Sequence, residues 1–134
     1  MSTVERRRIA ADFVMAFGGG RIDPQWLAPG WTCHNASLGQ ISGETYLVGI
    51  ADVQHILPSL TMTVEGTFAA DDRVAVQATS SAPLPDGTQY RNRYALLFRF
   101  DSQNRIAHVD AYFDTHVANT QLLPLVRERQ RQRA

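Results

Sequence analysis

The sequence predicts an α+β fold in which helices come first and an antiparallel sheet follows. Two segments with a helical spacing of apolar residues, 3–17 and 43–57, lie in the first half of the chain. Segments in which apolar and polar residues alternate follow between residues 60 and 115. Helices followed by a run of strands are typical of α+β domains. Because 134 residues are enough to bury one core, we expect a single domain over residues 1–134, with a flexible basic tail from about 125 to 134.

Local signals mark the ends of the predicted helices. Three glycines at 18–20 end the first helix, since glycine adopts the left-handed conformation that closes a helix. Asp23, which a proline follows, begins a short helical turn, and a short strand is expected over 31–35. Ser42 caps the second helix and Pro58 ends it.

Two strands are predicted before residue 90. The segment 60–68 alternates, with apolar residues on one side at Leu60, Met62, Val64 and Phe68. The segment 73–82 follows an acidic turn and leads to a loop rich in proline. Counting apolar residues alone turns Val74, Val76 and Ala78 of this strand toward the core.

A long hairpin over 90–115 is the clearest strand signal. A polar loop at 101–104 suits a hairpin of this kind, and it places Tyr94 opposite Ala111. Uncharged residues share one face: Asn92, Tyr94, Leu96, Phe98, Ala107, Val109, Ala111 and Phe113. The other face carries Arg91 opposite Asp114, together with Arg93, Arg99, His108, Asp110 and Tyr112. We therefore expect one face to build a core or cavity and the other to be a charged outer face.

Composition limits the function classes. The formal net charge is zero, which argues against nucleic acid or an anionic membrane as the main partner. All 13 basic residues are arginine, so a Schiff base formed by lysine is excluded. Cys33 is the single cysteine, which excludes an internal disulfide and favours a cytoplasmic location. No apolar run has the length of a membrane helix.

Several sequence features resemble one known family: WTCHN at 31–35, Gly43 at the start of the second helix, YRNRYALLFRF at 90–100 and RIAHVDAYFDT at 105–115. With the order of elements, they make the chain from Val4 to about Leu123 similar to the SnoaL-like polyketide cyclases. That group belongs to the ketosteroid isomerase-like and nuclear-transport-factor-like superfamily. The resemblance implies a cone-shaped, cystatin-like α+β barrel with a curved, mostly antiparallel sheet around the N-terminal helices. It also implies a dimer with an interior pocket for a small apolar molecule.

In layout the chain looks most similar to the limonene epoxide hydrolases, which hold a water molecule with an Asp–Arg–Asp set, a tyrosine and an asparagine. Matching the strands places their arginine on Gln77 and their aspartates on Thr79 and Ala111. Their tyrosine falls on Cys33, and their asparagine on Asn35. Since the asparagine alone is retained, we do not expect epoxide hydrolysis by that mechanism.

The expected cavity has a neutral polar lining. Strand parity turns Asn35, Asn92 and Tyr94 inward. The family match turns Gln77 and Thr79 inward, against the apolar count, and we follow the match. The predicted lining is Cys33, Asn35, Met62, Gln77, Thr79, Asn92, Tyr94, Leu96, Val109, Ala111 and Phe113. Such groups can orient a carbonyl or hydroxyl group by hydrogen bonds, or they can satisfy one another.

The candidate catalytic residues are His34, Asp110 and Tyr94. His34 has a suitable ordinary pKa, but its parity turns it away from Asn35. Alternation also puts Asp110 on the outer face, where an ion pair is the simpler interpretation. Cys33 lacks a base on its own side of the strand, which favours packing over nucleophilic chemistry. We expect no metal and no cofactor.

The sequence therefore predicts a SnoaL-like pocket protein that binds a small, mostly apolar ligand, with no reaction assigned. The alternative is an isomerase, cyclase or hydratase acting on a polyketide- or steroid-like substrate. In that alternative His34 or Asp110 is the general base, and Tyr94 and Asn92 hold the oxyanion. A third interpretation is an interaction module. In each case we expect a homodimer through the outer sheet face, with contacts at Arg91, Arg93, Asp110 and Tyr112.

Overall fold

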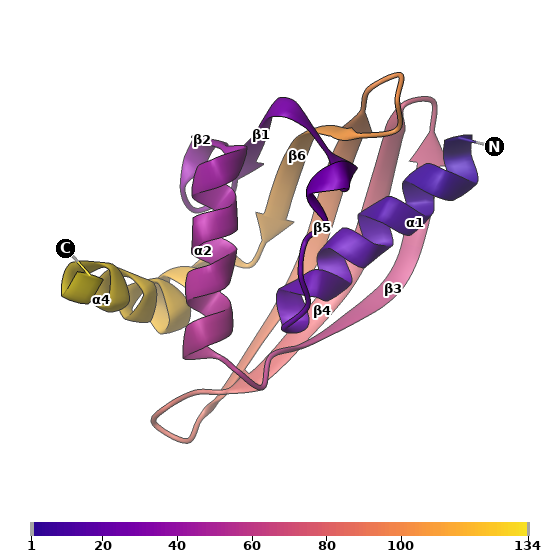
Figure 1. Cartoon of the computed structure of the whole chain (residues 1–134). Coiled ribbons are helices and arrows are strands. Elements are labelled where there is room, and N and C mark those ends of the chain that lie inside the picture. The colour runs from indigo at the N-terminus through magenta and orange to yellow at the C-terminus, as the bar shows by residue number, and fades with distance from the viewer. Residues whose placement is uncertain (1, 134) are drawn as a thin grey trace.

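The computed structural model describes residues 2–133 and confirms the α+β fold. A curved six-stranded sheet packs against helices α1 (Ser2–Met15) and α2 (Gly43–Ile56), as Figure 1 shows. Helix α1 lies across the strands β3 (Thr61–Ala70) and β4 (Arg73–Pro83). No helix among the described residues is long and apolar enough to cross a lipid bilayer.

The remaining strands are β1 (Leu27–Asn35), β2 (Gly39–Ser42), β5 (Gln89–Phe100) and β6 (Ile106–Phe113). Across the sheet the strands follow the order β2-β1-β6-β5-β4-β3. Strands β1 and β6 are parallel, and the other neighbouring pairs are antiparallel. Strand β1 is longer than the sequence predicted, and β2 was not predicted. The sheet is thus mixed at one place, where β1 lies beside β6.

The helix ends follow the predicted signals. Helix α1 continues into the 3-10 turn η1 (Ala16–Gly18), and Gly19 has a left-handed φ of 108°. The carboxylate of Asp23 accepts a backbone N–H at the start of the 3-10 turn η2 (Pro24–Trp26). The hydroxyl of Ser42 accepts one at the start of α2. Both caps satisfy N–H groups that have no partner within the helix.

The two faces of the β5–β6 hairpin agree with the prediction, but the register differs by two residues. Tyr94 pairs with Phe113, and the expected pairing of Arg91 with Asp114 does not occur in this ladder. Asn104 adopts the left-handed conformation with a φ of 60°, and the register shifts near the end of β5. Because side chains alternate with a period of two, a shift of two residues leaves the residues paired beyond the irregularity on their predicted faces. At the irregularity Ile106 is fully buried, whereas Ala107, which was predicted to face inward, is half-buried.

Strand β4 corrects the expected orientation of Gln77 and Thr79. The inward, buried side chains are Val74, Val76, Ala78 and Ser80. Gln77 is exposed and Thr79 is half-buried on the opposite face. A bulge in β3 after Val64 likewise turns Phe68 outward, where it is 61% exposed. The pattern of apolar residues along β4 therefore predicted the inward face correctly, and the residue match to the epoxide hydrolases predicted it wrongly.

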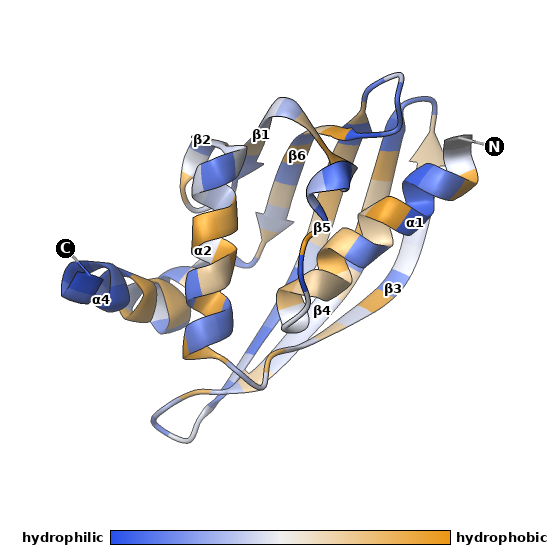
Figure 2. Ribbon diagram, viewed as in Figure 1, coloured by the Kyte–Doolittle hydropathy of each residue, from blue (hydrophilic) through white to orange (hydrophobic). Residues whose placement is uncertain are grey.

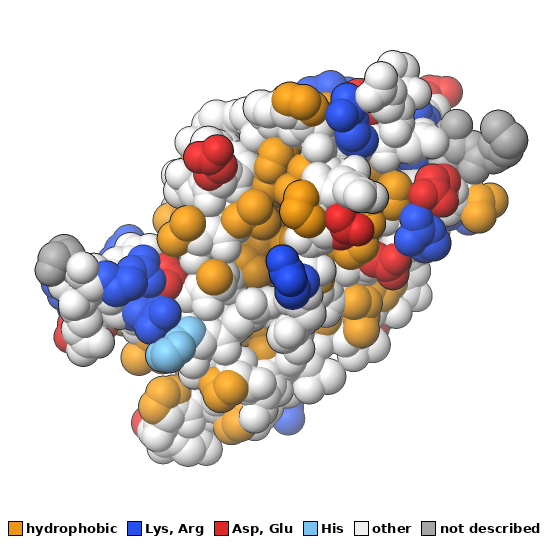
Figure 3. All heavy atoms as spheres, viewed as in Figure 1, with side chains coloured by type: hydrophobic (Ala, Val, Ile, Leu, Met, Phe, Trp, Pro, Cys, Tyr) orange, Lys and Arg blue, Asp and Glu red, His pale blue; other side chains and the backbone are white. Residues whose placement is uncertain are grey.

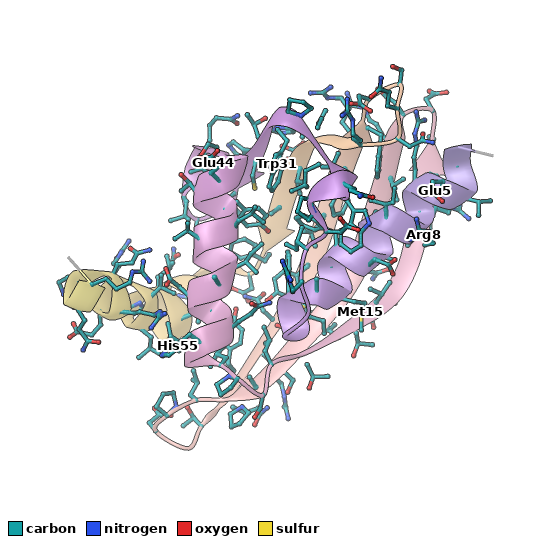
Figure 4. All side chains as sticks on the ribbon, in the orientation of Figure 1. Glu5, Arg8, Met15, Trp31, Glu44 and His55 are labelled. Carbon is teal, nitrogen blue, oxygen red and sulfur yellow. The ribbon has the colours of Figure 1, made fainter. Side chains whose placement is uncertain are left out.

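Aromatic rings join α1, α2 and the sheet into one core. The ring of Phe13 packs edge-on against Phe98 and Trp31, with centroids 5.4 and 6.0 Å away. Trp31 lies beside the start of α2 (Figure 4). A Cβ atom at Gly43 would lie 2.1 Å from Cε2 of Trp31. Helix α2 can pack this closely on β1 because residue 43 has no side chain.

After β6 the chain forms α3 (Thr115–Val117), the π-helical turn η3 (Ala118–Leu122) and α4 (Leu123–Arg133). Helix α4 covers the residues that were expected to form a flexible tail. It is hydrophobic at its start and hydrophilic at its end (Figure 2). Its packing against α2 brings both helices to one end of the sheet, where they line a cavity.

Candidate functional site

A cavity of about 440 Å³ lies between α2, α4 and one end of the sheet. Most of its walls are apolar side chains, among them Ile50, Val53, Leu60, Met62, Phe113 and Val126. The polar lining consists mainly of Asn35, Ser37, Thr45, Tyr94, Arg127 and Gln130. Figure 3 shows apolar side chains gathered on the face between α1 and α2. The size and the lining are those of a pocket for a small organic molecule.

Asn35 presents an amide donor to this cavity. Its Oδ1 accepts the backbone N–H groups of Ser37 and Leu38, at 2.9 and 3.1 Å. Because both partners are donors, the amide orientation is fixed. Its Nδ2 has no hydrogen-bond partner among residues 2–133, although Asn35 is only 8% exposed. An amide N–H that borders the cavity without a protein partner favours a ligand that brings an acceptor oxygen.

Tyr94 lies in the cavity wall with its hydroxyl held in place. Its Oη lies 2.8 Å from Oγ of Ser80, and its ring lies 6.0 Å from that of Phe113. Burial raises the pKa of the Tyr94 phenol, and the neighbouring Tyr90 raises it further. Burial also raises the pKa of Tyr46, another lining residue. Both phenols therefore remain neutral and act as hydrogen-bonding groups.

Asn92 is buried but does not line the cavity. Its Nδ2 donates to the hydroxyl of Tyr90 at 3.0 Å and to the carbonyl of Asp114 at 3.1 Å. Its Oδ1 accepts the backbone N–H groups of Arg93 and Asp114. These bonds tie β5 to the end of β6. The Asn92 side chain is structural, and the expectation that it holds a ligand is corrected.

Cys33 is completely buried and makes no part of the cavity wall. Burial, assisted by the charge of Asp110, raises the pKa of its thiol to about 12. A thiol with such a pKa carries almost no thiolate at neutral pH, so it is not a nucleophile. Cys33 packs in the core, as the sequence favoured.

His34 and Asp110 both lie on the outer face of the sheet. They are neighbours across the parallel pair β1–β6, and His34 is exposed. Asp110 Oδ1 lies 2.9 Å from Nε2 of His108, and the other ring nitrogen lies 2.7 Å from Oγ1 of Thr32. This chain of contacts is separated from the cavity by the sheet itself. Neither His34 nor Asp110 can act as a base on a molecule in the cavity, which corrects that part of the prediction.

The structure brings together four of the predicted lining residues: Asn35, Met62, Tyr94 and Phe113. Three others, Leu96, Val109 and Ala111, are buried in the core and do not line the cavity. The lining from α2, η3 and α4 was not predicted. Apolar residues at helical spacing in α2 carried a signal for it, whereas nothing in the basic C-terminal segment did.

A second hollow, of about 480 Å³, lies on the outer face. Hydroxyl and guanidinium groups line it, from Thr63, Thr79, Ser81, Arg91 and Arg93. The other lining residues are also polar or charged: Thr61, Ser80, Asn92 and Asp114. None of the lining residues is hydrophobic. Within residues 2–133, no group of three or more His, Cys, Asp or Glu side chains is arranged to hold a metal ion. The apolar cavity is therefore the candidate site.

Comparison with solved structures identifies the same fold in several proteins. A candidate SnoaL-like polyketide cyclase from Jannaschia sp. CCS1 is 16% identical, over 90% of this chain and 92% of its own, with a TM-score of 0.76. AclR, a candidate hydroxylase from Streptomyces galilaeus, is 16% identical over 94% of this chain and 98% of its own, with a TM-score of 0.74. A third match is a protein from Catenulispora acidiphila DSM 44928 with a ketosteroid isomerase-like fold, in complex with trimethylamine. It is 18% identical over 78% of this chain and 83% of its own, with a TM-score of 0.65. Further matches are described as nuclear-transport-factor-like proteins.

These likenesses show the fold, which hosts several kinds of chemistry. A search of curated proteins finds no match. The model of the SnoaL-like domain matches residues 8–109, which is more than half of the chain and ends within β6. The chain therefore belongs to the SnoaL-like domain family.

Proposed function

We propose that this protein binds a small, mostly apolar molecule in the cavity between α2, α4 and the sheet. The observation that carries the proposal is the lining: mostly apolar walls around about 440 Å³, with a few polar groups. Burial of apolar ligand surface in such walls is favourable by roughly 25 cal/mol per Å². The ligand body thus supplies affinity, and the polar groups set its orientation.

The polar groups favour a ligand with an acceptor oxygen. Asn35 offers a free amide N–H, and the hydroxyl of Tyr94 is held by Ser80. A carbonyl or hydroxyl oxygen that reaches Asn35 accepts this hydrogen bond, whereas a pure hydrocarbon that covers Asn35 displaces water from the donor and leaves it without a partner. We therefore expect a ketone to bind more tightly than the hydrocarbon of the same shape.

A second candidate function is an isomerase, cyclase or hydratase reaction on a polyketide- or steroid-like substrate. The family and the cyclase-like neighbours favour it. In this chain Asn35 and Tyr94 are suited to stabilise an oxyanion. With His34 and Asp110 outside the cavity, we assign no general base, and binding remains the first proposal.

A fluorescent apolar probe tests the binding proposal. N-phenyl-1-naphthylamine is uncharged and suits an apolar cavity. Gly49 lines the cavity, and a Cβ atom there would have no atom within 4 Å. A Gly49→Phe variant should fill the space and weaken probe binding at least tenfold, whereas Gly49→Ala should bind like the wild type. Absence of probe binding to the wild type, or equal binding by the Phe variant, would refute the proposal.

We also propose that the outer sheet face forms a homodimer, with contacts at Arg91, Arg93, Asp110 and Tyr112. Apolar side chains on this face support it, since Leu97, Tyr112 and Phe68 are 39%, 46% and 61% exposed. The cytoplasmic location inferred from the single cysteine stays a prediction.

A further inference from the structure

Arg127 is the one charged side chain that lines the cavity within the described residues. It comes from α4, on the same helix face as Val126 and Gln130, which also line the cavity. The rest of the polar lining is neutral. Any charge that the site recognises must therefore face a single guanidinium group.

The position of Arg127 is set by a buried carboxylate elsewhere. Asp52 of α2 is 1% exposed. It accepts hydrogen bonds from Arg129 at 2.9 Å, from Gln130 at 3.2 Å and from Arg133. All of these donors belong to α4. A buried carboxylate requires such partners, so Asp52 fixes the rotation of α4 and with it the side that faces the cavity.

Arg127 is left without an anionic partner in this arrangement. Arg129 and Arg133 pair with Asp52, and Arg131 pairs with Glu128. Arg127 forms no ion pair within residues 2–133, where the other arginines of α4 all do. A guanidinium group is a strong and specific donor to a carboxylate or another oxyanion. Arg127 is exposed to solvent and also lines the cavity, so its guanidinium group is available to pair with an oxyanion on a bound ligand.

We propose that the ligand is an apolar acid, whose hydrophobic body fills the cavity and whose single oxyanion, such as a carboxylate, pairs with Arg127. This inference rests on the proposed binding function and adds the chemical class of the ligand. Arg127 is then the residue that determines specificity for acids over neutral molecules of the same shape. A partly exposed pair of this kind contributes up to about 1 kcal/mol, which corresponds to a preference of roughly fivefold.

Two dyes that differ by one anionic group test the proposal. 8-Anilinonaphthalene-1-sulfonate carries a sulfonate, and N-phenyl-1-naphthylamine is its uncharged counterpart. Each is titrated by fluorescence into the wild type, Arg127→Gln, Arg127→Lys and the control Arg131→Gln, whose arginine pairs with Glu128 outside the cavity. Arg127→Gln should weaken the sulfonate dye about fivefold and leave the neutral dye within twofold. Arg127→Lys and Arg131→Gln should bind both dyes like the wild type.

The outcomes separate this inference from the binding function. If the neutral dye binds but Arg127→Gln affects both dyes equally or neither, the acid preference is refuted while the cavity still binds ligands. If Arg131→Gln weakens binding of the sulfonate dye as much as Arg127→Gln does, the change comes from the overall charge of α4 and not from Arg127, and the proposal is also refuted. If neither dye binds to the wild type, the binding function and the inference both fail.

Discussion

Replacing Asp52 by asparagine should loosen α4 from α2 and open the cavity. The carboxylate is 2% exposed as a side chain, and its partners Arg129 and Arg133 are 30% and 44% exposed. Asparagine keeps the size of the side chain but loses the charge. Its Nδ2 also places a donor where the carboxylate accepted a hydrogen bond, so at least one arginine loses its partner.

The expected loss of unfolding free energy is about 2 kcal/mol. Breaking a fully buried ion pair costs about 3–5 kcal/mol, and an exposed one costs about 0–1 kcal/mol. The Asp52 cluster lies between these cases, because the carboxylate is buried while water reaches both arginines. A change of about 2 kcal/mol is well above the error of a urea unfolding experiment on a chain of this size.

The pH dependence gives an independent check. The hydrogen bond from Arg133, with those from Gln130 and Arg129, lowers the pKa of Asp52 below its ordinary value, against the opposing effect of burial. A carboxyl group with a depressed folded-state pKa stabilises the fold above its unfolded pKa of about 3.9. That contribution is lost as the pH falls through the folded pKa. The difference between wild type and Asp52→Asn should therefore be constant near neutral pH and shrink below about pH 4.

Urea unfolding followed by circular dichroism, between pH 3 and pH 8, measures this difference. Hydrogen exchange of the α4 amides should accelerate in the variant at neutral pH. A difference below about 0.5 kcal/mol at pH 7, or one that does not change on acidification, would refute the role assigned to Asp52.

Three further substitutions test other parts of the structure. Gly43→Ala should destabilise the protein by about 1–3 kcal/mol through overpacking against Trp31. Gly49→Ala in the same helix should instead stabilise it by about 0.5–1 kcal/mol. If urea unfolding shows that both variants change the unfolding free energy in the same direction, the packing at Gly43 is contradicted. Tyr94→Phe should lower the unfolding free energy by about 1–2 kcal/mol because it leaves the Ser80 hydroxyl without its hydrogen bond. Adding Ser80→Ala to this variant should recover part of that loss. If the two substitutions have strictly additive effects on stability, the hydrogen bond is contradicted. Arg93→Glu should convert a dimer into a monomer by mass in solution, and an unchanged dimer would mean that this face is not the interface.

Alternation along the strands predicted which face most hairpin residues occupy but not their partners. Moving the pairing by two residues preserves every face, so the pattern cannot distinguish Phe113 from Ala111 as the partner of Tyr94. The choice depends on the left-handed Asn104 and the irregularity at the end of β5. Neither has a periodic signature in the sequence.

The candidate site was predicted where it rests on strands and missed where it rests on α4. Asn35 and Tyr94 followed from strand parity. Gln77 and Thr79 were misplaced because a residue match to another enzyme group was preferred to the apolar count, which the buried Val74 and Val76 bear out. Helix α4 depends on Asp52, a buried acid distant in the sequence, and a segment rich in arginine and glutamine gives no local sign of such a partner.

Methyl NMR of the methionine side chains tests the binding cavity most directly. Met62 lines the cavity and is 4% exposed, whereas Met15 is 48% exposed on α1, outside the cavity (Figure 4). With ¹³C-methyl methionine in the protein, N-phenyl-1-naphthylamine should shift the Met62 resonance in a saturable way through its aromatic rings and leave that of Met15 unchanged. A Met62 resonance that does not move at probe concentrations that saturate the fluorescence would contradict the account.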